Sequence, residues 1–180
     1  MESLEKNSKS FDKIISILGS NVGGSIDKFP DIQSEWEKNP YETTVELLKI
    51  VAKKQEDQNL RNNIANFFHR NEKYDLLNGA NSKLKQPINS IKNMIISSFM
   101  KIIKDKSENC ELRKKIIDGF KNGFLFFSPY SQSYKADIIT LLDYIASDDR
   151  ENKSIQKAAK ETLEKKEEWI PYLHKWGIIF

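Results

Sequence analysis

A stretch of 22 residues occurs twice in this chain and constrains its fold more than any other sequence feature. Residues 47–68 (LLKIVAKKQEDQNLRNNIANFF) and 99–120 (FMKIIKDKSENCELRKKIIDGF) align without a gap. A looser third copy covers residues 141–163. Internal repetition indicates a structure built from similar units. The shared positions are Lys49/Lys101, Ile50/Ile102, Lys54/Lys106, Glu56/Glu108, Leu60/Leu112, Arg61/Arg113, Ile64/Ile116 and Phe68/Phe120.

Each copy has the pattern of two helices joined by a short polar turn. In the second helix of the first copy, Leu60, Ile64 and Phe68 are four residues apart, so they lie on one face. Asp57, Asn109 and Asn152 precede the second helices, and Asp and Asn are favoured as N-caps. We therefore predict three helical hairpins, with helices over residues 41–54 and 57–70, 87–104 and 110–121, and 132–146 and 153–169.

Shorter helical segments precede the hairpins. We expect residues 1–8 to be frayed, Ser10 to cap a helix that ends at Gly19, and another short helix to follow Asp31. Asn39-Pro40 separates this helix from the first hairpin, because proline is well tolerated as the first residue of a helix. The length fits one all-helical domain over residues 1–180, with an N-terminal cap (1–39), repeats (40–170) and an apolar tail (171–180).

A single hairpin of this size cannot bury its apolar face, whereas neighbouring hairpins can share a core. The second helices read Asp57-x-x-Leu-Arg61, then Asn109-x-x-Leu-Arg113, then Asn152-x-x-Ile-Gln156. This pattern resembles HEAT repeats and, more loosely, armadillo repeats. The resemblance implies a short α-solenoid of about three irregular HEAT-like hairpins with helical caps, and a hydrogen-bonded ladder made by Asp57, Arg61 and Arg113. Gln156 interrupts that ladder in the third copy, and a plain helical bundle is the alternative architecture.

Composition limits the environment of the chain. It carries 29 Lys and Arg against 26 Asp and Glu, so its net charge is only +3. The single cysteine, Cys110, excludes an intramolecular disulfide. We expect no signal peptide and no membrane-spanning segment, since residues 94–103 form the longest apolar run and are interrupted by Ser and Lys. A cytoplasmic location is predicted, with secretion without a conventional signal peptide as the alternative.

Residues with catalytic or metal-binding chemistry are scarce. The two histidines, His69 and His174, form no metal-binding pair. We expect His69 to act as a cation in the last turn of its helix, where the helix dipole favours positive charge. Cys110 is expected to be a passive surface thiol, and residues 19–25 to be a turn rather than a phosphate loop. The sequence therefore predicts no enzyme, no metal and no cofactor.

Two features suggest binding surfaces. Lys101, Lys104, Lys106, Arg113, Lys114 and Lys115 make the middle copy basic, either as a solvated surface or as a phosphate-binding stripe. The connector 124–130 and the tail after Pro171 are rich in aromatic residues. Each either covers the end of a hairpin core or forms an exposed interface.

The leading functional hypothesis is a non-enzymatic protein-binding scaffold or adaptor with a groove formed by the second helices. The alternatives are a nucleic-acid-binding protein of the HEAT-like type, with a role in DNA repair, and a bacterial effector that binds a host protein. A protein partner is expected, nucleic acid is the second choice, and the sequence does not determine the oligomeric state. The predicted partner-binding residues are Arg61, Asn62, Arg113, Lys114, Phe126, Phe127, Tyr130 and Trp176.

Overall fold

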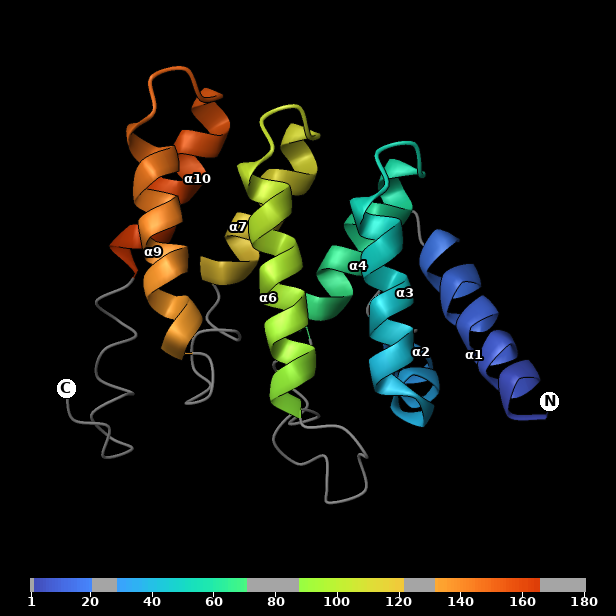
Figure 1. Cartoon of the computed structure of the whole chain (residues 1–180). Helices are drawn as coiled ribbons and strands as arrows, with labels where there is room; N and C mark the ends of the chain where they lie inside the picture. Colours follow the sequence, from blue (N-terminus) through green and yellow to red (C-terminus); the bar gives the residue numbers. More distant parts are fainter. Residues whose placement is uncertain (1, 21–28, 71–87, 122–131, 166–180) are drawn as a thin grey trace. The chain divides into compact units, whose positions relative to one another are not determined.

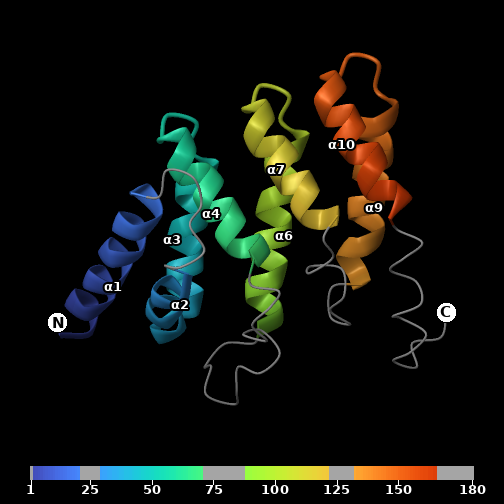
Figure 2. The ribbon, with the colours of Figure 1, turned by 180° about the vertical axis from the view of Figure 1, so that it is seen from behind.

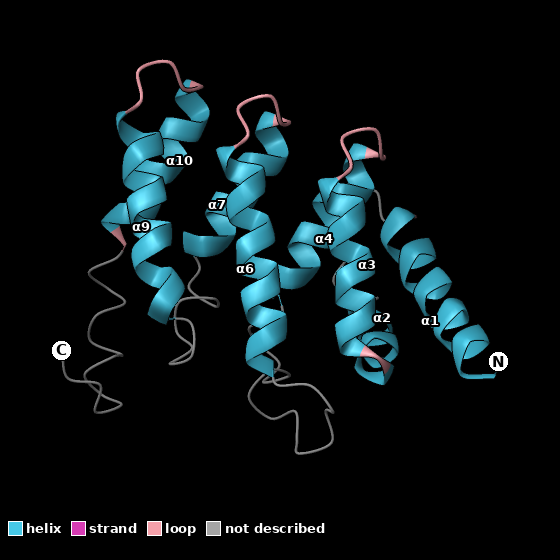
Figure 3. Cartoon of the chain, viewed as in Figure 1, coloured by secondary structure: helices cyan, strands magenta, loops and turns pink. Residues whose placement is uncertain are grey.

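The computed structural model describes residues 2–20, 29–70, 88–121 and 132–165. All regular structure within these ranges is α-helical, and no strand occurs there (Figure 3). The prediction of an all-α fold is therefore confirmed. The helices are α1 (Glu2–Gly19), α2 (Phe29–Lys38), α3 (Pro40–Ala52), α4 (Gln58–Arg70), α6 (Ile88–Lys104), α7 (Cys110–Lys121), α9 (Gln132–Ser147) and α10 (Lys153–Glu164) (Figure 1).

The chain divides into two compact units, Met1–Phe68 and His69–Phe180. The prediction of a single domain, which was based on chain length, remains a prediction.

The first unit is organised around the buried indole of Trp36. Its Nε1 donates a hydrogen bond of 2.9 Å to Oγ1 of Thr44, which joins α2 to α3. Its ring meets Phe67 of α4 edge-on, with ring centroids 6.4 Å apart. Asn63 Nδ2 donates to the carbonyl oxygen of Leu18 at the end of α1, at 2.9 Å. These contacts connect four helices around one apolar core.

The N-terminal helix differs from the prediction. It begins at Glu2, earlier than predicted, and Ser10 lies inside the helix instead of capping it. Ser10 Oγ donates to Oε2 of Glu35 on α2, and Lys13 Nζ donates to Oε1, both at 2.8 Å. Lys38 adds a further bond to the same carboxylate. Glu35 therefore joins α1 to α2, a contact that the local sequence pattern does not contain.

The second unit contains two helical hairpins, α6–α7 and α9–α10. The first helices, α6 and α9, lie on the side seen in Figure 1, and α7 and α10 lie on the opposite side, seen in Figure 2. Both layers are packed, because α6 contacts α9 and α7 contacts α10. The core between them contains Phe99, Ile103, Leu112, Ile116, Phe120, Ile138, Leu142, Ile145, Ile155 and Ala159, all nearly fully buried. Burying one such aliphatic or aromatic side chain contributes roughly 1.5–3 kcal/mol.

Most predicted helix limits agree with the structure to within two residues. The helix α10 ends at Glu164, and residues 166–169, which the prediction adds to it, lie outside the described residues.

Candidate functional site

The three hairpin turns have the same construction. They cover residues 53–57, 105–109 and 148–152, five residues each. In every turn the first N–H donates to a carbonyl three or four residues earlier, and the fourth N–H donates to the carbonyl of the first residue. The last residue then caps the second helix with its side-chain oxygen. The predicted capping roles of Asp57, Asn109 and Asn152 are confirmed.

A buried arginine closes each of the first two hairpins. Arg61 donates from Nε and Nη2 to the carbonyl oxygen of Val51, at 2.9 and 2.7 Å. Arg113 makes the same pair of bonds to Ile103, at 3.0 and 2.8 Å. Each bond spans ten residues, from the first turn of the second helix to the end of the first helix. Since carbonyls at a helix C-terminus lack partners within the helix, these guanidinium groups satisfy them.

Arg113 also connects its own hairpin to the next one. Its Nη1 and Nη2 donate to the two carboxylate oxygens of Glu151, at 2.9 and 2.6 Å, and both side chains are at most 3% exposed. These bonds hold the pKa of Glu151 below its usual value. In the third copy, Gln156 donates from Nε2 to the carbonyl of Asp148 at 2.6 Å. Gln156 thus bonds the first residue of the turn, eight residues back, instead of the end of the first helix, and the neutral amide cannot replace the ionic connection.

These contacts place several predicted partner-binding residues inside the protein. Arg61, Asn62 and Arg113 are buried, and Asn62 accepts a hydrogen bond from Gln58. Lys114 is exposed and pairs with Asp118 one turn further along α7, at 3.2 Å. Of the four, only Lys114 lies on the surface. The other predicted contacts, Phe126, Phe127, Tyr130 and Trp176, lie outside the described residues.

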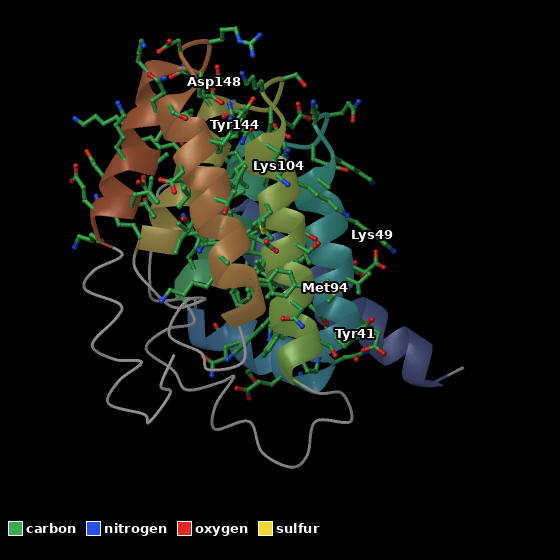
Figure 4. The ribbon with its side chains drawn as sticks, turned by 60° about the vertical axis from the view of Figure 1, so that its left-hand side comes forward. Tyr41, Lys49, Met94, Lys104, Tyr144 and Asp148 are labelled. Carbon is green, nitrogen blue, oxygen red and sulfur yellow. The ribbon has the colours of Figure 1, made fainter. Side chains whose placement is uncertain are left out.

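A surface hollow in the second unit lies at the first helices of the two hairpins. It has a volume of about 590 Å³ and is bordered mainly by α6 and α9. Tyr144 stands at its edge with 57% of its surface exposed, and it is the large hydrophobic residue that the described chain leaves exposed. Figure 4 shows Tyr144 beside Lys104, near the end of α9 that Asp148 follows. The lining residues are Met100, Lys104, Lys106, Arg113, Asp137, Thr140, Leu141, Tyr144, Ile145 and Glu151.

The charged groups of the hollow differ in whether they are already engaged. The Arg113–Glu151 pair is internally satisfied. Lys106 forms an ion pair with Asp148 across the two turns, and this bond lowers the pKa of Asp148 to about 2. Lys104 and Asp137, in contrast, have no charged partner within the described part of the chain. These two side chains are therefore available to a ligand.

The environment of His69 contradicts the prediction made for this residue. Its ring packs against Phe99 and Phe120, with centroid distances of 5.2 and 6.3 Å, and Nε2 is buried without a partner within the described chain. Burial, assisted by the charge of Lys115, lowers the pKa of His69 to about 4. The expectation of a cation at the helix end is wrong, because the imidazole is enclosed by apolar rings and stays neutral. Gly119 makes this packing feasible, since a Cβ there would lie 2.0 Å from the His69 ring.

The described residues carry no group of three or more His, Cys, Asp or Glu side chains suited to a metal ion. Cys110 is exposed, as predicted for a surface thiol. None of the helices seen in the described ranges combines the length and apolar character needed to cross a membrane.

Tyr144 is the surface residue that the sequence-based reasoning missed. The apolar positions of its helix are Ile138, Leu141, Leu142 and Ile145, and Tyr144 lies about a third of a turn from the centre of that stripe. An aromatic residue displaced from an apolar stripe is the signal that predicts its exposure.

Comparisons with protein-family models, with curated proteins and with solved structures find no match to this chain.

Proposed function

We propose that the chain is a non-enzymatic protein-binding module and that a partner segment occupies the hollow between α6 and α9. The exposure of Tyr144 beside this hollow carries the proposal. An aromatic residue that is left in water at the edge of a concave surface gains stability when a partner covers it. Tyrosine is also among the residues that most often dominate the binding energy of protein interfaces.

The chemistry of the lining fits a peptide contact. Met100, Leu141 and Ile145 supply an apolar floor, and Lys104 and Asp137 supply charges of both signs. Interfaces typically combine apolar anchors at the centre with polar groups that orient the partner at the rim. This location replaces the groove of the second helices expected from the sequence, because the arginines of that groove are engaged inside the hairpins.

We also infer that the hairpins are HEAT-like repeats. The support is their common construction: five-residue turns, an Asp or Asn cap, and an arginine that reaches back ten residues in the first two copies. Transplanting the turn 53–57 onto 105–109 tests this equivalence through three substitutions, Asp105→Lys, Ser107→Gln and Asn109→Asp. The variant is expected to melt within a few degrees of the wild type, whereas a large loss would contradict the inference.

Charge placement favours a protein partner over nucleic acid. Three of the six cations in the predicted basic cluster are already engaged: Arg113 is buried against Glu151, Lys106 is paired with Asp148 and Lys114 with Asp118. A phosphate-binding surface needs cations that are not already neutralised. We therefore expect weak binding to duplex DNA or RNA at physiological salt. Tight binding that weakens steeply with added salt would reverse this preference.

A peptide-display selection tests the proposed function. Random peptides are selected on the purified full chain, and the enriched peptides are measured against the wild type and Tyr144→Ala. We expect the substitution to weaken binding about ten-fold or more. Asp143→Ala is the matched control, because Asp143 is an exposed neighbour on α9 that does not line the hollow. Peptides that bind Tyr144→Ala as well as the wild type would refute the proposed site.

A further inference from the structure

The hollow between α6 and α9 has an ordered charge pattern. Lys106 and Asp148 lie in the turns that follow α6 and α9 and are paired, so the C-terminal ends of these two helices lie together. Lys104 is the last residue of α6 and therefore belongs to this end, beside Tyr144 (Figure 4). Asp137 lies seven residues before Tyr144, or about 10 Å back along α9. The hollow is thus positive at the turn end, apolar in the middle and negative at the far end.

We propose that the partner segment is an amphipathic α-helix that places a carboxylate at Lys104, apolar side chains over Met100 and Leu141, and a cation at Asp137. This inference rests on the proposed function and names the chemistry of the ligand for the same site. The three contacts correspond to positions i, i+3/i+4 and i+7 of the partner helix.

The spacing of the lining residues favours a helical partner. Asp137, Leu141 and Tyr144 lie at positions i, i+4 and i+7 of α9, and all three border the hollow. A second helix aligned with α9 advances by the same 1.5 Å per residue, so its side chains meet these contacts turn by turn. An extended segment advances about 3.3 Å per residue and alternates its side chains between two faces. It therefore matches this spacing less well.

The number of available cations favours a carboxylate over a phosphate group. Among the lining residues, Arg113 donates to Glu151 through both terminal nitrogens, and Lys106 is paired with Asp148. Lys104 is then the one lining cation of the described chain whose ammonium group has no anionic partner. One ammonium group balances a single negative charge, whereas a phosphate brings nearly two and usually meets several Arg or Lys groups.

Charge-reversal rescue with synthetic helices tests the inference on the full chain. A dipolar peptide of about fifteen residues carries Glu, two Leu and Lys at positions i, i+3/i+4 and i+7 of an Ala-rich helix. A lysine peptide has Lys in place of that Glu, and a broken peptide has Pro at its centre. Fluorescence anisotropy of the labelled peptides gives their dissociation constants.

We expect the wild type to prefer the dipolar peptide over the lysine peptide by about five-fold, and Lys104→Glu to reverse this order. Lys101→Glu introduces the same charge one turn earlier on α6, at an exposed position outside the lining, and is expected to keep the wild-type order. The broken peptide is expected to bind at least ten-fold more weakly, because proline interrupts the helix.

Three results would overturn the inference. If Lys104→Glu and Lys101→Glu have the same effect, the carboxylate does not contact Lys104. If the broken peptide binds as well as the dipolar one, the partner is not helical. If all peptides bind equally and lose binding in Tyr144→Ala, the charge order is wrong while the protein-binding site stands. Display peptides that bind independently of Tyr144 would instead refute the proposed function itself.

Discussion

The buried ion pair between Arg113 and Glu151 leads to the most informative stability prediction. Replacing Glu151 with Ala leaves the Arg113 guanidinium in place, because its bonds to the Ile103 carbonyl remain. Two of its N–H groups then lose their acceptors in a site where both side chains are at most 3% exposed. The backbone N–H of Asn152 also loses the bond that it donates to Glu151.

The expected loss in the free energy of unfolding follows from the Arg113 charge and the N–H groups that are left without partners. Breaking a buried ion pair by removing one partner costs about 3–5 kcal/mol, because the remaining charge is not solvated. For a chain of this size, each kcal/mol corresponds to roughly 2–4 °C in melting temperature. Glu151→Ala is therefore expected to lower the melting temperature by about 6–20 °C.

A double substitution separates the charge from the packing. Arg113→Met with Glu151→Leu removes both charges and keeps apolar volume, but it leaves the Ile103 carbonyl without its donor. An unsatisfied buried carbonyl costs about 1–3 kcal/mol. The double variant should therefore be more stable than Glu151→Ala, and the cycle should give a coupling energy of about 2 kcal/mol or more.

The same pair makes a defined contribution to pH dependence. The hydrogen bonds from Arg113 hold the pKa of Glu151 in the folded protein below its unfolded value. The unfolded chain therefore binds a proton first as the pH falls. The stabilisation is present above the unfolded pKa and is lost as the pH falls through the folded pKa. Glu151→Gln should consequently reduce the loss of stability on the acid side.

Urea unfolding followed by circular dichroism, with hydrogen exchange of α7 and α10, measures these effects. Exchange is expected to accelerate in both helices of Glu151→Ala, because the ion pair joins their hairpins. A cost below about 1 kcal/mol, or a coupling energy near zero, would refute the claim that this pair is buried and holds the two hairpins together.

Three further predictions concern the cores of the two units. Gly119→Ala is expected to lower the free energy of unfolding by about 2 kcal/mol or more, because the new Cβ would lie 2.0 Å from the His69 ring. Gly19→Ala is the control, because its new Cβ would meet nothing within 4 Å. Equal melting temperatures of the two variants would contradict this packing. Thr44→Val should cost about 1–3 kcal/mol in urea unfolding, since the buried Trp36 Nε1 loses its acceptor, whereas exposed Thr140→Val should change little. Stability should fall as the pH drops from the ordinary His value toward about 4, because the folded pKa of His69 lies below the unfolded one and the unfolded chain takes up the proton first. His69→Phe should flatten that part of the pH profile, and an unchanged profile would show that His69 is not the group responsible.

The helices could be predicted well because their signals are local. Apolar spacing, Asn and Asp caps and Pro40 act within a few residues of the positions they determine. Cys110–Lys121 is observed with the limits that the pattern predicts. The role of Ser10 was predicted wrongly because Glu35, which accepts hydrogen bonds from Ser10 and Lys13, lies more than twenty residues away.

The roles of the arginines could be predicted only in part. Their recurrence at Arg61 and Arg113 indicates a structural position, but a cation near a helix start is equally consistent with an exposed binding residue. The choice depends on whether a carbonyl or a carboxylate from another segment reaches the guanidinium. For Arg113 these partners are Ile103, ten residues away, and Glu151, 38 residues away.

The sequence by itself determined the all-helical class, the three hairpins and their capped turns, because each depends on hydrogen bonds and side-chain spacing within one segment. Only the tertiary structure decided which of the polar residues are inside and where the surface is hollow. Lys104 and Tyr144 border one hollow because α6 packs against α9, although they are 40 residues apart in the chain. Burial and charge pairing depend on which helices pack together. Helices that pack together can lie far apart in the sequence, and a local sequence pattern does not indicate which ones do.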